Sequence, residues 1–184
     1  TAYYMSDYIS TIRRNDIVLI HAAAGGVGSL LIQLSKLAGA IVIAKVSSDE
    51  KEELAKRLGA DFTINYTKKP YEVEIESILK GRRLDISFNA VGGASVTKDM
   101  RLLGSGGRLF LFGGAELLKG RWGIFSKLSF LRKMGIILPV ALMMRSKSIL
   151  GVNMLKIADN KPHVIEACMK EVMALFESGK LVPQ

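Results

Sequence analysis

The sequence predicts an α/β domain built on a doubly wound, parallel β-sheet. Short apolar runs rich in β-branched residues recur along the chain, segments with helical spacing of leucines and other apolar residues separate them, and glycines end several of these segments. Of the 184 residues, 49% are hydrophobic and 23% are charged, which is typical of a globular domain with a core and excludes a disordered or collagen-like chain. The length, with no linker and no internal repeat, favours a single domain.

The first half of the chain alternates predicted strands with predicted helices. Residues 17–21 are nearly all apolar, as in a strand buried on both faces, and residues 29–37 carry leucines at helical spacing. Gly59 ends a second predicted helix. The elements of this half are helices at 1–10, 29–37, 47–58 and 71–79, and strands at 17–21, 41–46 and 61–65.

The second half continues this alternation and adds one interruption. Residues 116–146 predict a long, mostly helical insert. Strands that alternate with helices pair in parallel and are covered on both faces, so the chain predicts a six-stranded parallel sheet between helical layers. The elements of this half are strands at 84–88, 108–112 and 148–154, and helices at 94–103 and 162–178.

Charge and cysteine content narrow the possible functions. The net charge of +9 favours an anionic partner or serves solubility, but no nucleic-acid motif accompanies the basic pairs at 13–14 and 82–83, so we expect no nucleic-acid partner. The single cysteine, Cys168, excludes an internal disulfide and a structural zinc site and fits a reducing, cytoplasmic compartment. The apolar run at 135–144 is shorter than the roughly 20 residues of a transmembrane helix.

A glycine-rich turn joins the first predicted strand to the first predicted helix. The segment Ala22-Ala-Ala-Gly-Gly-Val-Gly28 is close to the dinucleotide fingerprint Gly-x-Gly-x-x-Gly. Glycines permit unusual backbone angles, let the main chain approach a pyrophosphate and let helix and strand pack closely, while the helix N-terminus offers free N–H groups. The turn therefore predicts dinucleotide binding in a Rossmann fold; a tight turn that binds nothing is the alternative.

The end of the second predicted strand favours NADP(H) over NAD(H). NAD-binding domains place an acidic residue here to bind the ribose hydroxyls, whereas this strand ends in Val46, Ser47 and Ser48. Hydroxyls near the cations Lys45 and Lys51 suit a 2′-phosphate, because they donate hydrogen bonds and supply positive charge. In the alternative interpretation, Ser47 caps the following helix and Lys51 is merely solvated; the two can hold together.

Four segments of the chain are together specific for one family. They are His21-Ala-Ala-Ala-Gly-Gly-Val-Gly28, Val46-Ser-Ser-Asp-Glu-Lys51, Leu58-Gly-Ala-Asp61 with Ile64-Asn-Tyr66, and Asn89-Ala-Val-Gly-Gly93. In order and spacing they resemble the zinc-independent quinone oxidoreductases of the medium-chain dehydrogenase/reductase superfamily. The resemblance covers nearly the whole chain. Residues 113–120 and the insert after them further resemble the vesicle amine transport protein branch.

The resemblance implies a set of contacts with NADP(H). The glycine turn holds the pyrophosphate, the end of the second strand grips the 2′-phosphate, and the later strands border the ribose and the nicotinamide. The implied contacts are Gly25, Gly26, Val27 and Gly28 for the pyrophosphate, Ser47, Lys51 and Tyr66 for the 2′-phosphate, Asn89 for the ribose, and Phe112, Gly113, Val152 and Asn153 for the nicotinamide.

The resemblance also implies that a part of the enzyme lies outside this chain. Family members contain a second, catalytic domain, so we expect residues 1–184 to be an NADP(H)-binding domain excised from a two-domain reductase. The parent would transfer hydride to a quinone or a conjugated carbonyl, and the isolated chain would bind cofactor with little activity. We identify no catalytic residue and no metal ligand; His21 is interpreted as a packed, hydrogen-bonded residue.

Two other functions stay open. One is an enoyl reductase domain of a larger synthase, and the other is an NADPH-binding protein that acts at a membrane surface or as an interaction module, since basic residues flank the apolar run of the insert. Residues 148–154 predict an edge strand with apolar side chains, and such an edge invites pairing with a second copy. We therefore expect a homodimer.

Overall fold

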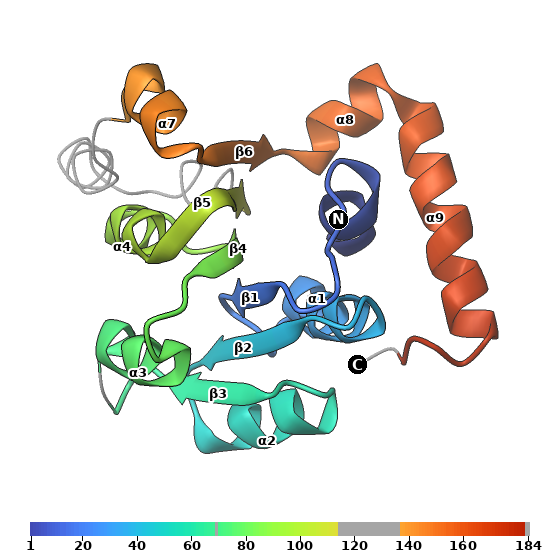
Figure 1. Cartoon of the computed structure of the whole chain (residues 1–184). Helices are drawn as coiled ribbons and strands as arrows, with labels where there is room; N and C mark the ends of the chain where they lie inside the picture. The colour runs from blue at the N-terminus through green and yellow to red at the C-terminus, as the bar shows by residue number, and fades with distance from the viewer. Residues whose placement is uncertain (69, 114–136, 183–184) are drawn as a thin grey trace, which may run out of the picture.

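The predicted parallel sheet is present and has the predicted number of strands. The computed structural model describes residues 1–68, 70–113 and 137–182, and in them six strands pair in parallel in the order β3-β2-β1-β4-β5-β6 (Figure 1). The strands are β1 (Ile17–Ile20), β2 (Ile41–Val46), β3 (Phe62–Asn65), β4 (Leu84–Asn89), β5 (Leu103–Phe112) and β6 (Ser148–Val152). This order reverses direction between β1 and β4, so the fold class is confirmed as a doubly wound Rossmann sheet.

Helices cover both faces of the sheet. The N-terminal segment η1, α1, α2, α8 and α9 contribute to the apolar cluster on one face, and α3 and α4 cover the other. The helices are the π-helical η1 (Tyr4–Tyr8) and the α-helices α1 (Gly26–Leu37), α2 (Asp49–Arg57), α3 (Tyr71–Leu79), α4 (Ala94–Leu102), α7 (Pro139–Arg145), α8 (Met154–Asn160) and α9 (Pro162–Glu177).

Side-chain alternation along buried strands produces two apolar layers. All of β1 is buried; Val18 and Ile20 join the cluster under α1, while Ile17 and Leu19 join the cluster under α3 and α4. The same alternation holds along β2, β5 and β6 and breaks on β4, where Leu84 joins the layer under α3 and α4 but Ile86 joins the other layer, across a register shift between these two residues. Phe110, the centre of the first layer on β5, stacks on a phenylalanine of β4 with ring centroids 4.9 Å apart.

Several predicted boundaries differ from the observed ones for local reasons. Helix α1 begins at Gly26, inside the glycine turn, and β5 begins at Leu103 instead of residue 108, with a register shift against β4. The prediction that residues 153 and 154 extend β6 is wrong. The Asn153 side chain accepts a hydrogen bond from the Lys156 N–H at 3.3 Å and thereby caps α8, a helix that the sequence analysis did not predict.

The structure describes only the end of the predicted insert, and it describes the single cysteine in full. Of the insert, residues 114–136 lie outside the described residues, and its end forms α7. Cys168 on α9 is buried, and burial raises the pKa of its thiol. Within residues 1–68, 70–113 and 137–182, no helix is both long enough and apolar enough to cross a bilayer.

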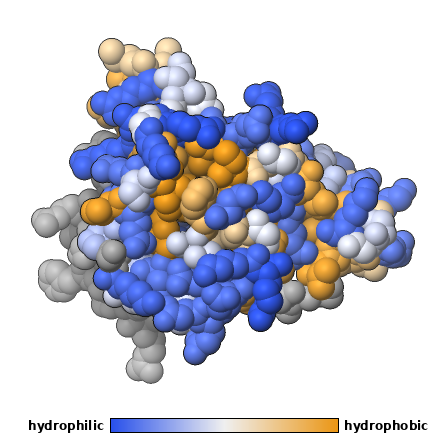
Figure 2. All heavy atoms as spheres, turned by 60° about the horizontal axis from the view of Figure 1, so that its bottom comes forward, coloured by the Kyte–Doolittle hydropathy of each residue, from blue (hydrophilic) through white to orange (hydrophobic). Residues whose placement is uncertain are grey.

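A shallow groove marks the β3 side of the molecule. Figure 2, with the bottom of Figure 1 turned forward, shows apolar atoms gathered in the middle of this side and hydrophilic atoms around them. The groove between β3 and α3 is lined by Phe62, Thr63, Val73, Glu74, Ser77 and Ile78. None of these residues belongs to the predicted cofactor contacts, so the groove and the predicted site are separate.

Removing a phenylalanine ring from the core should lower the free energy of unfolding far more than removing one from the β3 edge. Phe110 is fully buried, so we expect Phe110→Ala to lower the free energy of unfolding by about 3–5 kcal/mol. Phe62 is 42% exposed, and the matched change Phe62→Ala should cost clearly less. Urea-induced unfolding followed by circular dichroism measures both values; equal losses for the two variants would contradict the assignment of Phe110 to the core.

Candidate functional site

The carboxyl ends of the parallel strands bring the predicted contacts to one edge of the sheet. The register places Val46 of β2 beside Asn65 of β3, and Phe112 of β5 beside Val152 of β6. The glycine turn follows β1 in the middle of this edge, where the strand order reverses. Open α/β sheets bind ligands at this switch point, because the loops on its two sides diverge and leave a crevice.

The glycine turn has an exposed rim and a tightly packed floor. Gly25 and Gly26 are exposed, whereas Gly28 is buried. The carbonyl of Gly25, the N-cap of α1, accepts the Ser29 N–H at 2.8 Å, the first hydrogen bond of the helix. The N–H groups of residues 26–28 therefore belong to the first turn, where a helix provides no acceptors of its own.

The space around each glycine shows which one the fold requires. A Cβ on Gly28 would lie 2.4 Å from the carbonyl oxygen of Ala22 and 2.7 Å from the Cα of Ala23, so no side chain fits there. A Cβ on Gly26 would meet nothing within 4 Å. The open, glycine-lined space in front of the helix N-terminus fits a pyrophosphate group, which needs close main-chain approach and N–H donors.

Ser47 and Lys51 lie together at the end of β2. The Lys51 Nζ donates a hydrogen bond to the Ser47 Oγ at 3.0 Å, and both side chains are accessible. The cap of α2 is Ser48, whose Oγ accepts the Lys51 N–H at 3.4 Å. The alternative interpretation of Ser47 as the helix cap is therefore wrong, and the structure pairs its hydroxyl with a cation.

Tyr66 and Asp49 border the same corner. The Tyr66 ring follows β3, is 47% exposed and lies 4.9 Å from the Lys45 Nζ. The Asp49 carboxylate accepts hydrogen bonds from Lys68 at 2.6 Å and from Asn65 at 2.9 Å, and these bonds lower the pKa of Asp49. The Asp49 carboxylate is thus paired with a cation, which reduces its repulsion of an anionic ligand.

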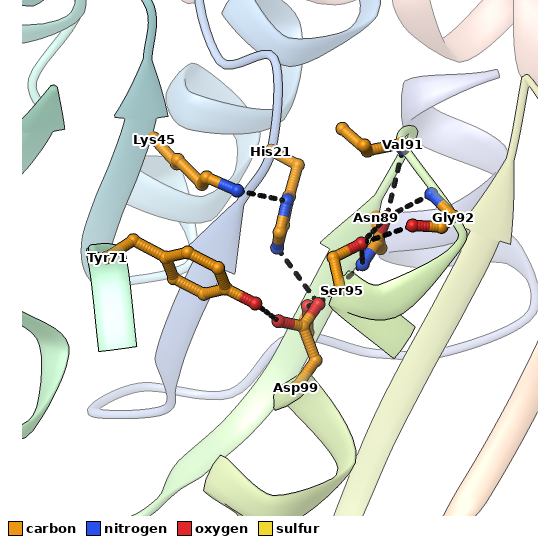
Figure 3. Close-up of polar contacts among 9 residues, drawn as sticks. His21, Lys45, Tyr71, Asn89, Val91, Gly92, Ser95 and Asp99 are labelled. Carbon is orange, nitrogen blue, oxygen red and sulfur yellow. Dashed lines mark hydrogen bonds and ion pairs between the residues drawn. The ribbon is translucent and has the colours of Figure 1, made fainter. Parts of the chain in front are cut away.

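The side chain of Asn89 is fully engaged inside the protein (Figure 3). Its Nδ2 donates to the Ser95 Oγ at 2.9 Å and to Asp99 Oδ2 at 2.7 Å. Its Oδ1 accepts the N–H groups of Val91 and Gly92, each at 2.9 Å. A contact between Asn89 and a ribose stays a prediction; the loop that Asn89 supports, residues 90–93, is the part of this region open to a ligand.

The two segments predicted to border the nicotinamide lie side by side. Phe112 pairs with Val152 at the ends of β5 and β6. Gly113 follows with a φ of 75°, a left-handed conformation that glycine adopts without strain. Asn153 is exposed and caps α8, so its side chain is partly committed to the fold.

A buried polar cluster beneath this edge was not predicted as a unit. His21 Nε2 lies 2.9 Å from Asp99 Oδ2, the Tyr71 hydroxyl donates to Asp99 Oδ1 at 3.0 Å, and the Lys45 Nζ lies 3.4 Å from His21 Nδ1 (Figure 3). The interpretation of His21 as a packed, hydrogen-bonded residue is confirmed. Polar residues in apolar strands, His21, Lys45 and Ser87, were the available signal, because they share the strand parity of the α3/α4 layer.

Burial and pairing act together on the charges of this cluster. Burial opposes ionisation of Asp99, but hydrogen bonds from His21, Ser87 and Asn89 hold the pKa of its carboxyl below the usual value. Burial lowers the pKa of Lys45, which the charge of Asp99 counteracts, and burial raises the pKa of the Tyr71 hydroxyl. Tyr71 therefore stays a neutral donor.

No metal site accompanies this cluster. Over the described part of the chain, no group of three or more His, Cys, Asp or Glu side chains is placed to hold a metal ion. The residues present therefore do not fit a zinc site.

Comparisons with known proteins find a family and several proteins to which this chain is similar. The model of the zinc-binding dehydrogenase family matches residues 26–175. The synaptic vesicle membrane protein VAT-1 homolog of Danio rerio is 30% identical over 185 residues, which cover 100% of this chain and 38% of that protein. A quinone oxidoreductase of Pseudomonas syringae pv. Tomato DC3000 superposes with a TM-score of 0.78 at 27% identity, over 98% of this chain and 51% of that one.

A second solved structure shows the same fold at lower identity. The Escherichia coli quinone oxidoreductase complexed with NADPH superposes with a TM-score of 0.77 at 23% identity, over 98% of this chain and 51% of that chain. The chain thus spans about half the length of these solved oxidoreductases and less of the vesicle protein.

A methyl group at Gly28 should destabilise the fold, whereas one at Gly26 should not. The collision with the Ala22 carbonyl predicts that Gly28→Ala lowers the free energy of unfolding by roughly 1–3 kcal/mol. Gly26→Ala adds a methyl to open space in a helix and should leave stability unchanged or higher. Denaturant unfolding measures both; a Gly28→Ala chain as stable as the parent would disprove the close approach.

Proposed function

The chain belongs to the zinc-binding dehydrogenase family, and from this membership we propose that residues 1–184 are the NADP(H)-binding domain of a zinc-independent quinone oxidoreductase-like reductase. One observation carries the proposal: an exposed glycine turn at the switch point of the sheet lies near a serine–lysine pair at the end of β2. The first feature suits a pyrophosphate, and the second suits a phosphate on the adenosine ribose.

The preference for NADP(H) rests on the charges at the end of β2. An NAD-binding strand would present a carboxylate to the ribose hydroxyls. Here Lys51 and the Ser47 hydroxyl occupy this place, and the Asp49 carboxylate is occupied by Lys68 and Asn65. The Escherichia coli relative of the same fold was solved with NADPH, which supports the same choice.

The remaining contacts follow the edge of the sheet from β1 to β6. We propose that Gly25 and the first turn of α1, residues 26–28, hold the pyrophosphate, with the N–H groups of residues 26–28 as the donors. The loop after Asn89 would face the nearer ribose, and the Phe112–Gly113 and Val152–Asn153 segments would border the nicotinamide. Together they present the reactive ring at the ends of β5 and β6.

The reaction that we propose for the parent protein is hydride transfer to a quinone or a conjugated carbonyl. NADPH supplies the hydride when bound, and this chain binds and orients it. No step of the proposal uses zinc, because the chain has one cysteine and the described residues do not fit a zinc site.

Substrate-selecting and catalytic residues are expected in the other half of the parent, so the isolated chain should bind cofactor with little reductase activity. An enoyl reductase of a synthase would use the same cofactor contacts.

A second candidate function has one specific observation in its favour. Met143 and Met144 of α7 are 78% and 83% exposed, and Arg145 follows them. Apolar side chains beside a cation suit a membrane surface or a protein partner, and the Danio rerio relative is named as a vesicle membrane protein. Co-sedimentation with vesicles containing anionic lipid would support this function, and no binding at physiological salt would count against it.

The remaining parts of the proposal concern assembly and location. Strand β6 ends the sheet, so its outer edge offers backbone groups to a second copy, and we propose a homodimer through residues 148–154. The single cysteine, buried and unpaired, suits the cytoplasm.

The chain should bind NADPH more tightly than NADH, and Lys51 should carry the difference. We expect a preference of roughly tenfold, equal to about 1.4 kcal/mol, that Lys51→Ala abolishes because the 2′-phosphate loses its cation. Fluorescence titration with each dinucleotide measures the two dissociation constants. Lys56→Ala is the matched control, since Lys56 is an exposed lysine of the same helix, α2, paired with Glu53.

The titration tests the 2′-phosphate site and the dinucleotide site separately. Equal affinity for the two dinucleotides would disprove the 2′-phosphate site and keep the dinucleotide site. Loss of the preference in Lys56→Ala as well would indicate a general effect of charge. Binding of neither dinucleotide at millimolar concentration would contradict the proposed function of this chain.

Self-association through β6 should be sensitive to charge on the outer strand. Gly151 is exposed, and a Cβ there would meet nothing within 4 Å, so Gly151→Lys should leave the monomer folded. In a symmetric pair of β6 strands, the new lysine would lie near its own copy and repel it. Analytical ultracentrifugation should show a dimer for the parent chain and a monomer for the variant; a monomeric parent chain would rule the dimer out.

A further inference from the structure

A chain of buried polar side chains runs beneath the proposed cofactor edge, and the cofactor contacts do not account for it (Figure 3). It consists of Lys45, His21, Asp99 and Asn89, which we call the buried relay. Asp99 is fully buried, and the other three members are at most 7% exposed. Burying charges costs free energy unless each is paired, so a simple apolar core would have been the easier arrangement.

Residue type fixes the direction of the hydrogen bonds at one end of the relay. The Lys45 ammonium can only donate, so His21 Nδ1, 3.4 Å away, is assigned as the acceptor. The proton of the neutral imidazole then lies on Nε2, which faces Asp99 Oδ2 at 2.9 Å. His21 thereby links the cation to the carboxylate, and the two charges offset each other.

Residue type also fixes the direction of the hydrogen bond at the other end of the relay, between Asn89 and Asp99. A carboxylate has no proton to donate, so the amide nitrogen of Asn89 must face Asp99, at 2.7 Å. The amide oxygen then points the opposite way, where it accepts the N–H groups of Val91 and Gly92. Asp99 thus determines which way the Asn89 amide points, and the amide determines the path of the loop.

The Asp99 carboxylate contacts residues on both sides of the switch point. His21 begins the turn after β1, and its own N–H donates to the Phe88 carbonyl of β4 at 2.9 Å. Asn89 ends β4 and precedes the loop in which Gly92 adopts a φ of 69°. On both sides of the switch point, the residue at which the chain leaves its strand therefore contacts Asp99.

We propose that Asp99 is a positioning residue for dinucleotide binding, which holds the loop after β4 in register with the glycine turn. The inference rests on the proposed function, because the dinucleotide is the ligand that would span both loops. A site tolerates errors of only about half an ångström in its supporting groups, so a change in this loop should reach the ligand. The residues that contact Asp99 are His21, Tyr71, Ser87 and Asn89, and none of them belongs to the proposed 2′-phosphate contacts, so Asp99 should affect NADPH and NADH alike.

The test is the substitution Asp99→Asn. Asparagine has the same size, and its amide oxygen can take the position of Oδ2, which His21, Ser87 and Asn89 face, while its NH₂ group replaces Oδ1 opposite the Tyr71 hydroxyl. The neutral amide oxygen accepts hydrogen bonds more weakly than a carboxylate does, so it holds the Asn89 amide less firmly. We expect both dissociation constants to rise roughly tenfold with the NADPH-to-NADH ratio unchanged, in contrast to Lys51→Ala, which changes the ratio.

Tyr71→Phe is the matched control. It removes the hydroxyl that donates to Asp99 Oδ1 at 3.0 Å but keeps the ring and the contacts of Oδ2 with His21 and Asn89. We expect this variant to lose stability and keep its affinity for both dinucleotides. If it loses affinity as strongly as Asp99→Asn, or if Asp99→Asn binds like the parent chain, the positioning role is overturned.

A cofactor-free measurement keeps this inference separate from the proposed function. Backbone amide exchange at Val91 and Gly92, followed by NMR without dinucleotide, should be faster in Asp99→Asn and unchanged in Tyr71→Phe. Unchanged exchange in Asp99→Asn would overturn the inference, whether or not the parent chain binds a dinucleotide. If the parent chain binds neither dinucleotide, that result by itself rejects only the proposed function.

If Asp99→Asn does not fold, Asn89→Ala cuts the same link and leaves Asp99 with donors from His21, Ser87 and Tyr71. Roughly tenfold weaker binding of both dinucleotides would then support the positioning role, and the affinity of the parent chain would overturn it.

Discussion

The contact between α1 and the turn after β1 at Gly28 is the constraint on which the site depends. No side chain fits between residue 28 and the carbonyl of Ala22, so the first turn of α1 packs directly against the short turn that follows β1. Its first N–H groups are therefore presented at the carboxyl edge of the sheet, next to the point where the strand order reverses. A longer or looser connection would keep the sheet but lose this alignment of donors.

A sheet covered on both faces imposes a second constraint on the same edge. Polar side chains at the ends of buried strands cannot all reach water, so they must satisfy one another. His21 and Asn89 on the strand ends and Asp99 on α4 meet this demand with one carboxylate. The arrangement is sensitive, because losing any member leaves a buried group without its partner.

Patterns within a single element were predictable, and contacts between elements were not. The β-branched run of β2 gave its bounds correctly, and the glycine turn indicated both the fold and a dinucleotide site. The second serine of the pair at 47–48, instead of the first, caps α2, because cap geometry depends on backbone angles that two adjacent serines do not reveal. Asp99 was missed because the side chains that contact it come from the turn after β1, from α3 and from β4, which are far apart in sequence.

The two ends of the proposed site are held by different kinds of interaction. Lys51 and Ser47 are accessible, so their effect on a 2′-phosphate is electrostatic, weakened by salt, and changeable by a single substitution. The loop after β4 is held from beneath by hydrogen bonds that water and salt do not reach. In the proposed site, the choice between dinucleotides can therefore change at the surface while the buried relay keeps the ligand in place. The proposal thus makes cofactor choice and cofactor orientation physically separate properties.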